Sequence, residues 1–440
     1  MSKASAWSFH DVGDGIKPAV AVDTNNIAHV SFLTENLAGA VFHAMYNESL
    51  NVFEVDTVST GYFYGPCDIE IDQLGRPHVS YHDHGLGGDL AHLVLSVSSW
   101  DTLPVHHEGH DGWDSEIAFD SENNTHIISI DPPIGSQGNG LEYAVYKGGK
   151  WTIESLNTRK GLNYGFGIGF QMDQNDIPLV SYYDDAETHL YYGNRSTGTW
   201  ELNKIDSVGD VGKYSSMIVD EQNDVHLCYV EILSIDSTVL HYNHLSGGSW
   251  NRIALDTLKG VSPSARKVLS LQMDSKGMLH VIYGTDSELV YLIQDSLTWN
   301  KEVIVDKALT GVELAEGMRF KLDKNDNAHL VYYQKDAVSN SGFKIRYATN
   351  SSNVANSIKD KTSKHDKIKV FPNPFSSRLV VNRLVSNSVV KLFNNHGQQV
   401  FRFISQTDNL EINTSNLQIG MYFLQVINDG SVSKLKVLKH

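Results

Sequence analysis

The sequence predicts an all-β protein in which a seven-bladed β-propeller is followed by a small β-sandwich. Three observations predict this fold class. A motif of about 50 residues occurs repeatedly, the strands within each copy are short and apolar, and the composition changes after residue 366. The chain is also rich in Gly, Tyr and Phe, and none of its apolar runs approaches the roughly 18 residues of a membrane-spanning helix.

The first half of each copy consists of an apolar strand that ends in Asp, a polar turn, and a second apolar strand. The aspartates are Asp23, Asp72, Asp120, Asp173, Asp220, Asp274 and Asp323. Six copies carry a histidine six residues later, and the fourth copy has Leu179 there; the histidines are His29, His78, His126, His226, His280 and His329. A residue repeated in this way is expected to hold its blade together, through an Asp to His hydrogen bond across the hairpin.

The second half of each copy adds a strand of the form Leu-x-Tyr and a fourth strand that usually opens with Trp. The openers are Trp100, Trp151, Trp200, Trp250 and Trp299. Four short strands per copy are typical of a propeller blade. The seventh copy lacks a Trp strand, and AWSFHDV at the N-terminus, with Trp7, can replace it. We therefore predict a propeller over residues 5–350 that is closed by its N-terminal strand, which leaves no sheet edge unpaired.

The charge of the chain is unevenly distributed. Residues 367–440 carry nine Lys or Arg against three Asp or Glu, whereas the rest carries 26 against 49. An acidic body disfavours nucleic acid as a partner, because contacts to phosphates need a basic face. Cys67 and Cys228 lie far apart within apolar runs, so we expect two buried thiols and no disulfide.

The C-terminal part of the chain carries the most recognisable motifs. Residues 351–366 are polar and lack aromatic residues, which is typical of a linker. The motifs KVFPNPF, VVKLFNNHGQQVF and LQIGMYFLQVINDGSVSKLKVLKH follow within residues 367–440. This segment resembles the type A C-terminal sorting domain of proteins exported by the type IX secretion system of Bacteroidetes. The resemblance implies an Ig-like β-sandwich that serves as an export signal and is removed or exchanged for a surface anchor.

The resemblance also implies a location and a partner. We expect a secreted protein or one attached to the outer surface, with residues 367–440 read by the type IX machinery and no membrane-spanning segment. Such proteins also need an N-terminal signal for the inner membrane. The N-terminal residues contain no apolar run of that kind, so we expect that this signal has been removed.

A histidine cluster is the strongest sign of function in the propeller. Trp113 is the one tryptophan outside the opener position. Six histidines outside the repeated position fall within 29 residues: His82, His84, His92, His106, His107 and His110. In a four-stranded blade, the loop between strands two and three and the connection to the next blade emerge on the same face. YHDHGLGGDL and VHHEGHDGW are one of each, so we expect them to meet at one rim of the channel. His92 and His43 take the place of Tyr in the third strand and are expected to be packed.

The same face collects further polar and aromatic residues from other blades. They are Tyr62, Tyr64, Arg159, Lys160, Tyr164, Asp184, Asp185, His189, Lys213, Tyr214, Arg266 and Lys267. Aromatic rings beside polar and charged groups suit a polysaccharide, because sugar faces stack on the rings while hydroxyls meet polar side chains. A solvated polar rim without a ligand is the alternative. The predicted catalytic residues are His84, His107, His110, Tyr164 and Lys213. The predicted substrate-binding residues are Trp113, His82, Tyr62, Tyr64, Arg159, Tyr214 and Lys267.

Two reactions are open to such a site. In β-elimination from a uronate-containing polysaccharide, His or Tyr removes a proton and Arg or Lys neutralises the developing charge. Hydrolysis needs two carboxylates roughly 5 to 10 Å apart, and the sequence offers His and Tyr more visibly. If the protein is an enzyme, a lyase is therefore favoured over a glycoside hydrolase. A non-catalytic lectin, a protein-binding adhesin and a scaffold remain alternatives. HDH and HHEGH could ligate a metal, but their spacing matches no strong zinc pattern, so no metal site is predicted and the cofactor stays unknown.

Overall fold

The computed structural model describes most of the chain, in several stretches. The described residues are 7–36, 38–48, 50–86, 88–96, 99–103, 105, 112–131, 140–156, 167–235, 237–259, 269–285, 288–295, 298–306, 314–335, 342–351, 369–384, 388–394, 399–428 and 431–440. These residues are all-β, as predicted, and their one helical element is the 3-10 helix η1 (His84–Leu86). None of the described helical residues forms a helix long and apolar enough to cross a membrane.

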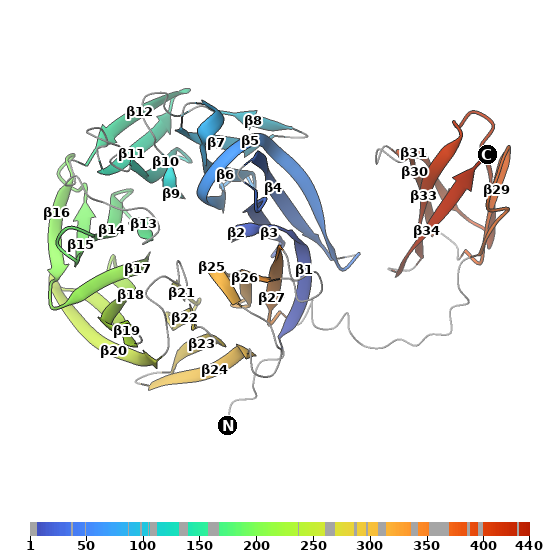
Figure 1. The fold of residues 1–440 in the computed structure, drawn as a ribbon. Coiled ribbons are helices and arrows are strands. Elements are labelled where there is room, and N and C mark those ends of the chain that lie inside the picture. Colours follow the sequence, from blue (N-terminus) through green and yellow to red (C-terminus); the bar gives the residue numbers. More distant parts are fainter. Residues whose placement is uncertain are drawn as a thin grey trace. The chain divides into compact units, whose positions relative to one another are not determined.

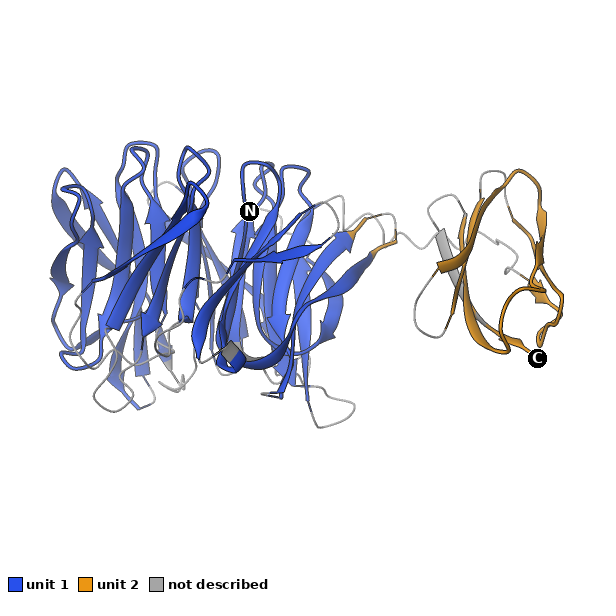
Figure 2. Cartoon of the chain, turned by 90° about the horizontal axis from the view of Figure 1, so that it is seen from above, with its two compact units in different colours: residues 1–46, 52–355 blue, residues 47–51, 356–440 orange. Residues whose placement is uncertain are grey.

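The chain divides into two compact units (Figure 2). Unit 1 comprises residues 1–46 and 52–355, and unit 2 comprises residues 47–51 and 356–440. In unit 1, small sheets stand side by side around a centre (Figure 1). This arrangement is propeller-like.

The described part of unit 1 contains five four-stranded sheets and one seven-stranded sheet. The seven-stranded sheet contains β2 (Ile16–Val22), β3 (Ala28–Leu33), β4 (Ala38–Asn47), β5 (Val52–Ile71), β6 (Pro77–Asp83), β7 (Asp89–Leu95) and β8 (Trp100–Thr102). The next two sheets contain β9 (Trp113–Phe119), β10 (Thr125–Asp131), β11 (Gly140–Lys147) and β12 (Lys150–Ser155), then β13 (Ile168–Met172), β14 (Pro178–Asp184), β15 (His189–Asn194) and β16 (Glu201–Asp206). Two further sheets contain β17 (Asp210–Val219), β18 (Val225–Ser234), β19 (Ser237–Ser246) and β20 (Ser249–Lys259), then β21 (Leu269–Met273), β22 (Leu279–Gly284), β23 (Glu288–Asp295) and β24 (Thr298–Asp306).

The remaining sheet of unit 1 joins the two ends of the repeat array. It contains β25 (Leu314–Leu322), β26 (Ala328–Lys335), β27 (Phe343–Thr349) and, from the N-terminus, β1 (Ser8–Asp14). β1 pairs antiparallel with β27, from Ser8 opposite Thr349 to Asp14 opposite Lys344. The N-terminal strand therefore completes the sheet that the last repeat begins.

The repeated Asp and His form the expected contact in the six hairpins that carry both residues. His Nε2 lies 3.3 Å from the Asp carboxylate in the pairs of Asp72, Asp120, Asp220 and Asp323, 3.4 Å in that of Asp274 and 3.9 Å in that of Asp23. The other ring nitrogen, Nδ1, forms a hydrogen bond with a side chain of the third strand. In His126, His226, His280 and His329 this partner is a Tyr hydroxyl at 2.5 to 2.7 Å. In His29 and His78 it is the imidazole of His43 and of His92, respectively, at 2.9 Å. The repeated histidines and the packed His43 and His92 are thus structural, as predicted.

Aromatic contacts connect each repeat to the next. The third-strand Tyr or His of one repeat meets the fourth-strand aromatic residue of the next with its ring edge, at centroid distances of 5.1 to 6.0 Å. The pairs are His43 with Trp100, His92 with Trp151, Tyr143 with Trp200, Tyr192 with Trp250, Tyr242 with Trp299, Tyr291 with Trp7, and Tyr347 with Phe53. The opener tryptophans are therefore packed between neighbouring repeats.

The turns between the first two strands also link neighbouring repeats. The third residue after each Asp has a positive φ, between 61° and 77°, and is Asn, Asp or Gly. Where it is Asn or Asp, its side chain can accept a hydrogen bond from the backbone N–H of the preceding repeat's turn. The described bonds run from Gln73 to Asn123 (2.9 Å), Ser121 to Asp176 (2.7 Å), Gln174 to Asn223 (2.9 Å) and Ser275 to Asp326 (2.8 Å).

Unit 2 contains two sheets that share one core. The smaller sheet contains β28 (Lys369–Phe371), β29 (Arg378–Asn382) and β32 (Asn409–Asn413). The larger sheet has the order β31-β30-β33-β34 and contains β30 (Ser388–Asn394), β31 (Gln399–Ser405), β33 (Gly420–Asn428) and β34 (Ser431–Lys439). Phe375, Leu379, Leu392 and Leu424 are fully buried between them. This arrangement is a small sandwich.

Candidate functional site

Four of the predicted site residues meet at one place in unit 1. Tyr62 lies on β5, His82 near the end of β6, His84 at the start of η1, and Trp113 at the start of β9. The centroid of the His82 ring lies 4.8 Å from that of Trp113 and 6.3 Å from that of His84. Phe63 is the Cα partner of Asp83, which sets Tyr62 beside the strand end that leads into His84. We name these four residues the rim cluster.

The members of the rim cluster differ in exposure. His82 is 1% exposed, Trp113 is half-buried, Tyr62 is 54% exposed and His84 is exposed. The planes of His82 and Trp113 make an angle of 35°, so the imidazole packs obliquely against the indole. His82, which we expected to bind substrate, is therefore buried against Trp113, and a ligand can reach the exposed Tyr62 and His84 and the exposed part of Trp113.

The local backbone explains why Trp113 lies here. Gly112 has a φ of 92°, and a Cβ at this position would come within 2.7 Å of Leu90 Cα. Gly65 has a φ of 70°, and a Cβ there would lie 3.5 Å from Trp113 Cε3. Glycine is thus required beside Leu90 and accommodates the indole against β5. At η1, Asp83 Oδ1 accepts the N–H of Gly85 at 2.8 Å, which forms the turn that exposes His84.

Buried carboxylates surround the rim cluster. Asp83 and Asp89 are opposite each other in the pairing of β6 with β7, and they are 7% and 1% exposed. Asp114, directly after Trp113, is 1% exposed and has a positive φ of 51°. These carboxylates lie next to the rim cluster along the chain, and Asp114 also acts on Arg319 in the interior of unit 1.

Lys213 and Tyr214 belong to a separate group on β17. Lys213 Nζ lies 2.8 Å from Asp210 Oδ2 and 4.8 Å from the centroid of the Tyr183 ring, and the Tyr183 hydroxyl donates to Asp210 Oδ1 at 2.7 Å. Burial and the bond to Asp210 raise the pKa of Tyr183. Tyr214 is 4% exposed. Lys213 is therefore already paired with a carboxylate, and the Tyr214 ring packs in the interior.

The other predicted site residues cannot be placed. His107, His110, Tyr164, Arg159 and Lys267 lie outside the described residues, as does the side chain of Tyr64. The cations that an elimination reaction would need, apart from Lys213, belong to this group.

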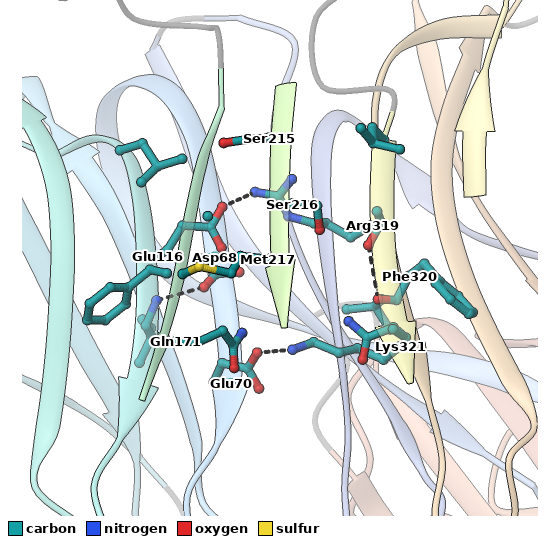
Figure 3. A pocket seen from close by; sticks show the side chains of 18 residues that line it. Asp68, Glu70, Glu116, Gln171, Ser215, Ser216, Met217, Arg319, Phe320 and Lys321 are labelled. Atoms are coloured by element: carbon teal, nitrogen blue, oxygen red, sulfur yellow. Dashed lines mark hydrogen bonds and ion pairs between the residues drawn. The ribbon is translucent and has the colours of Figure 1, made fainter. Parts of the chain in front are cut away.

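A cavity lies at the centre of unit 1, among the inner strands of the sheets (Figure 3). Its volume is about 60 Å³, which is room for a few water molecules. Arg319 on β25 pairs with Glu116 on β9 at 2.5 Å, and Lys321 on β25 pairs with Glu70 on β5. Asp68 Oδ2 accepts the N–H of Ile117 at 2.9 Å. The other polar lining residues are Gln171, Ser215, Ser216, Ser270 and Gln272.

The two cations of the cavity are held in their charged form. Burial alone would lower the pKa of Arg319 and of Lys321, but the facing carboxylates outweigh it and raise both values. Glu116 and Asp68 act on Arg319, and Glu70 acts on Lys321. The ion pairs therefore cross the channel, and this cavity is too small for a sugar ring.

These charges were not singled out from the sequence, although the repeat contains a signal for them. The residues four and two positions before the repeated Asp face the channel. In the second, third and seventh copies these positions hold Asp68, Glu70, Glu116, Arg319 and Lys321, where the other four copies hold neutral residues. Comparing the copies position by position would have identified them.

Solved structures with a similar fold include polysaccharide-active proteins. An ulvan lyase of polysaccharide lyase family PL25, solved with a bound -[GlcA(1-4)Rha3S]- unit, is 13% identical with a TM-score of 0.51, and the alignment covers 77% of this chain and 95% of the lyase. A fungal alcohol oxidase of the AA5 family, in complex with copper, is 11% identical with a TM-score of 0.53, over 99% and 100% of the two chains. A lectin of Aleuria aurantia is 13% identical with a TM-score of 0.44, over 67% and 97%. At these identities the likeness of the lyase and of the oxidase concerns the fold.

No curated protein matches the chain. A family model does match its C-terminal part, over residues 369–440. This stretch covers the three motifs that resembled a sorting domain, so that prediction is confirmed, and it indicates export to the cell surface or beyond. Residues 369–440 belong to the secretion system C-terminal sorting domain family.

Proposed function

We propose that unit 1 binds a polysaccharide at the rim cluster and that the sorting domain brings it to the cell surface or the medium. The observation that carries this proposal is the position of Trp113, which is half-buried, supported by the buried His82 and flanked by the exposed Tyr62 and His84. An indole held in this way offers a sugar a rigid apolar face next to hydrogen-bonding groups.

The size of the central cavity limits where a polysaccharide can bind. The Arg319–Glu116 and Lys321–Glu70 pairs cross the channel and leave room only for small molecules. A polysaccharide therefore has to lie across the rim and cannot thread through the ring. An open rim would accept units from within a long chain as well as its ends.

Cleavage by β-elimination is the second candidate. His84 is an exposed imidazole beside His82, which packs against Trp113, and a neutral imidazole can accept the proton next to a uronate carboxylate. The similarity in fold to an ulvan lyase agrees with this chemistry but does not assign it. A lectin or an adhesin would need the same rim without the proton transfer.

We also infer that the ring is closed and has seven blades. The support for this is that β1 completes the sheet of β25 to β27, and that seven edge-on aromatic contacts connect successive repeats, including Trp7 with Tyr291 and Phe53 with Tyr347. β5, at 20 residues, supplies the last strand of one blade and the first of the next. A chain that lacks residues 1–14 is expected to unfold at a lower temperature, because β27 loses its partner.

Two assays separate the candidate functions. A glycan array with uronate and neutral polysaccharides tests binding, and the ultraviolet absorbance of unsaturated sugars tests elimination. A lyase would release such products, and His84→Ala would stop their release while binding persists. A lectin would bind without product in both forms. If the parent protein neither binds nor cleaves any polysaccharide, the proposal is wrong.

A further inference from the structure

The larger sheet of unit 2 has an unusual outer face. Alternate residues of its strands point into the core, among them Leu392, Tyr422 and Leu424. The residues between them point to the other side, which we name the outer face. In an antiparallel sheet with one buried face, the other face is ordinarily polar. Here it carries Phe423, Leu438 and Ile404, which are 46%, 45% and 42% exposed.

The pairing of the strands arranges the outer face in rows. Phe393 lies opposite Phe423, and Val389 lies opposite Ile404. Between these two apolar rows, Lys391 lies opposite Arg402. Like charges directly opposite each other on one face of a sheet repel. Neither cation has an ion pair within the described residues, and the sequences of β30, β31, β33 and β34 contain no Asp or Glu. The face therefore lacks the anions that would balance it.

We propose that the outer face docks onto an acidic protein surface of the secretion machinery, with carboxylates between Lys391 and Arg402 and apolar side chains over Phe393, Phe423 and Ile404. Large apolar side chains exposed on one face mark an interaction site, and a carboxylate bound by both cations removes their repulsion. This inference rests on the proposed export of the chain and adds which surface is recognised and by what chemistry.

A protein fits this face better than an anionic membrane does. Interfacial membrane anchors are rich in Trp and Tyr, and the outer face carries Phe, Ile and Leu instead. β34 places Lys434 and Lys436 opposite Gln425 and Phe423, so the cations of this face are distributed among its apolar residues and do not form the compact basic cluster that recognises anionic lipids. Apolar rows on either side of one charged row match a surface with the complementary pattern.

The experiment measures export of the full chain. It is expressed behind an inner-membrane signal in a bacterium with a type IX secretion system, and the exported fraction is quantified by immunoblot. We expect Lys391→Glu with Arg402→Glu to lower the exported fraction about tenfold, because carboxylates would then face carboxylates. Lys391→Arg with Arg402→Lys is expected to be exported like the parent.

A matched control makes the same charge change on the smaller sheet. Lys369 and Arg378 are exposed there, so Lys369→Glu with Arg378→Glu is expected to leave export nearly unchanged. Thermal unfolding and polysaccharide binding of the purified chains show that each variant is folded. Equal export defects in the two double variants, or none in either, would overturn the proposal. If the parent itself is not exported, the proposed export of the chain is wrong, and the choice of docking surface is not what has failed.

Lipid binding is measured separately. The full chain is floated with vesicles of equal parts phosphatidylcholine and phosphatidylglycerol, and we expect no vesicle binding that depends on Lys391 and Arg402. Flotation of the parent that is lost in Lys391→Glu with Arg402→Glu would show that the face binds lipid, and the proposed protein partner would be wrong.

Discussion

Arg319 on β25 donates to Glu116 on β9 at 2.5 Å across the central channel, although 203 residues separate them. The two strands belong to different sheets. Both side chains are largely buried, with 18% and 20% of their surface exposed. The pair thus fastens two sheets that are far apart in the sequence.

Breaking this pair is expected to destabilise unit 1. Arg319→Met leaves the Glu116 carboxylate buried without its partner, and such a loss costs about 3 kcal/mol. Arg319→Met combined with Glu116→Leu removes both charges and is expected to recover most of that loss. Denaturant unfolding of the full chain measures both. A double variant as unstable as Arg319→Met would show that the unpaired Glu116 carboxylate is not the cause of the lost stability.

The turns between the first two strands offer a way to stabilise the ring. Gly75 and Gly277 occupy the positive-φ position that is Asn or Asp in the other repeats, and a Cβ at either would have no neighbour within 4 Å. Gly75→Asn and Gly277→Asn are expected to supply the missing bond to the preceding turn and to add up to about 1 kcal/mol each. Asn123→Gly is expected to lose a similar amount.

Thermal unfolding tests these turn variants. Gly148→Asn is the control, because Gly148 also has a positive φ, 61°, and open surroundings but lies in a different turn. A rise in Tm as large for Gly148→Asn as for Gly75→Asn would mean that the loss of glycine flexibility, and not the new bond, stabilises the protein.

The buried histidines predict that stability falls in mild acid. Burial lowers the pKa of His43 to about 3 and of His78 to about 4, and the pKa of His92 lies well below its ordinary value. These imidazoles stay neutral in the folded state, while the unfolded chain protonates them below a pH of about 6.5. Stability is therefore complete above that pH and is lost as the pH falls toward the folded pKa values, by about 1.4 kcal/mol per pH unit for each group.

Replacing two of these histidines tests the pH effect. Four other repeats have a Tyr whose hydroxyl bonds the repeated His, as Tyr143 does with His126 at 2.6 Å. His43→Tyr with His92→Tyr is therefore expected to fold and to reduce the drop in Tm between neutral pH and pH about 5. An unchanged drop would mean that these two residues do not contribute.

Trp113 is expected to provide most of the binding energy of the rim cluster. Trp113→Ala should weaken polysaccharide binding about tenfold or more, and Trp113→Phe less, because a smaller ring keeps part of the stacking. Isothermal titration with a polysaccharide identified on the array measures the difference. Phe9→Ala, which removes an aromatic side chain 38% exposed on β1, is the control and should bind like the parent.

Part of the rim cluster could be predicted from the sequence. The repeat accounts for the other tryptophans, so Trp113 and the histidines beside it could be recognised as exceptions, and strand connectivity predicted that His82, His84 and Trp113 would meet. The sequence did not predict that His82 is buried, because side-chain exposure depends on how β6 packs against β9. Nor did it predict that Lys213 is paired, because the register shift in β17 between Val211 and Lys213 and the contact with Tyr183 on β14 belong to the tertiary structure, although Asp210 is on the same strand.

The sequence by itself determined the all-β class, the repeated blade, the structural role of its histidines and the sorting domain, because these follow from local patterns that recur or match a family. Only the tertiary structure decided which charges face each other across the channel and which faces stay uncovered. Arg319 with Glu116, and Lys391 with Arg402, are relationships between strands, and no local pattern encodes the register and ring geometry that bring them together.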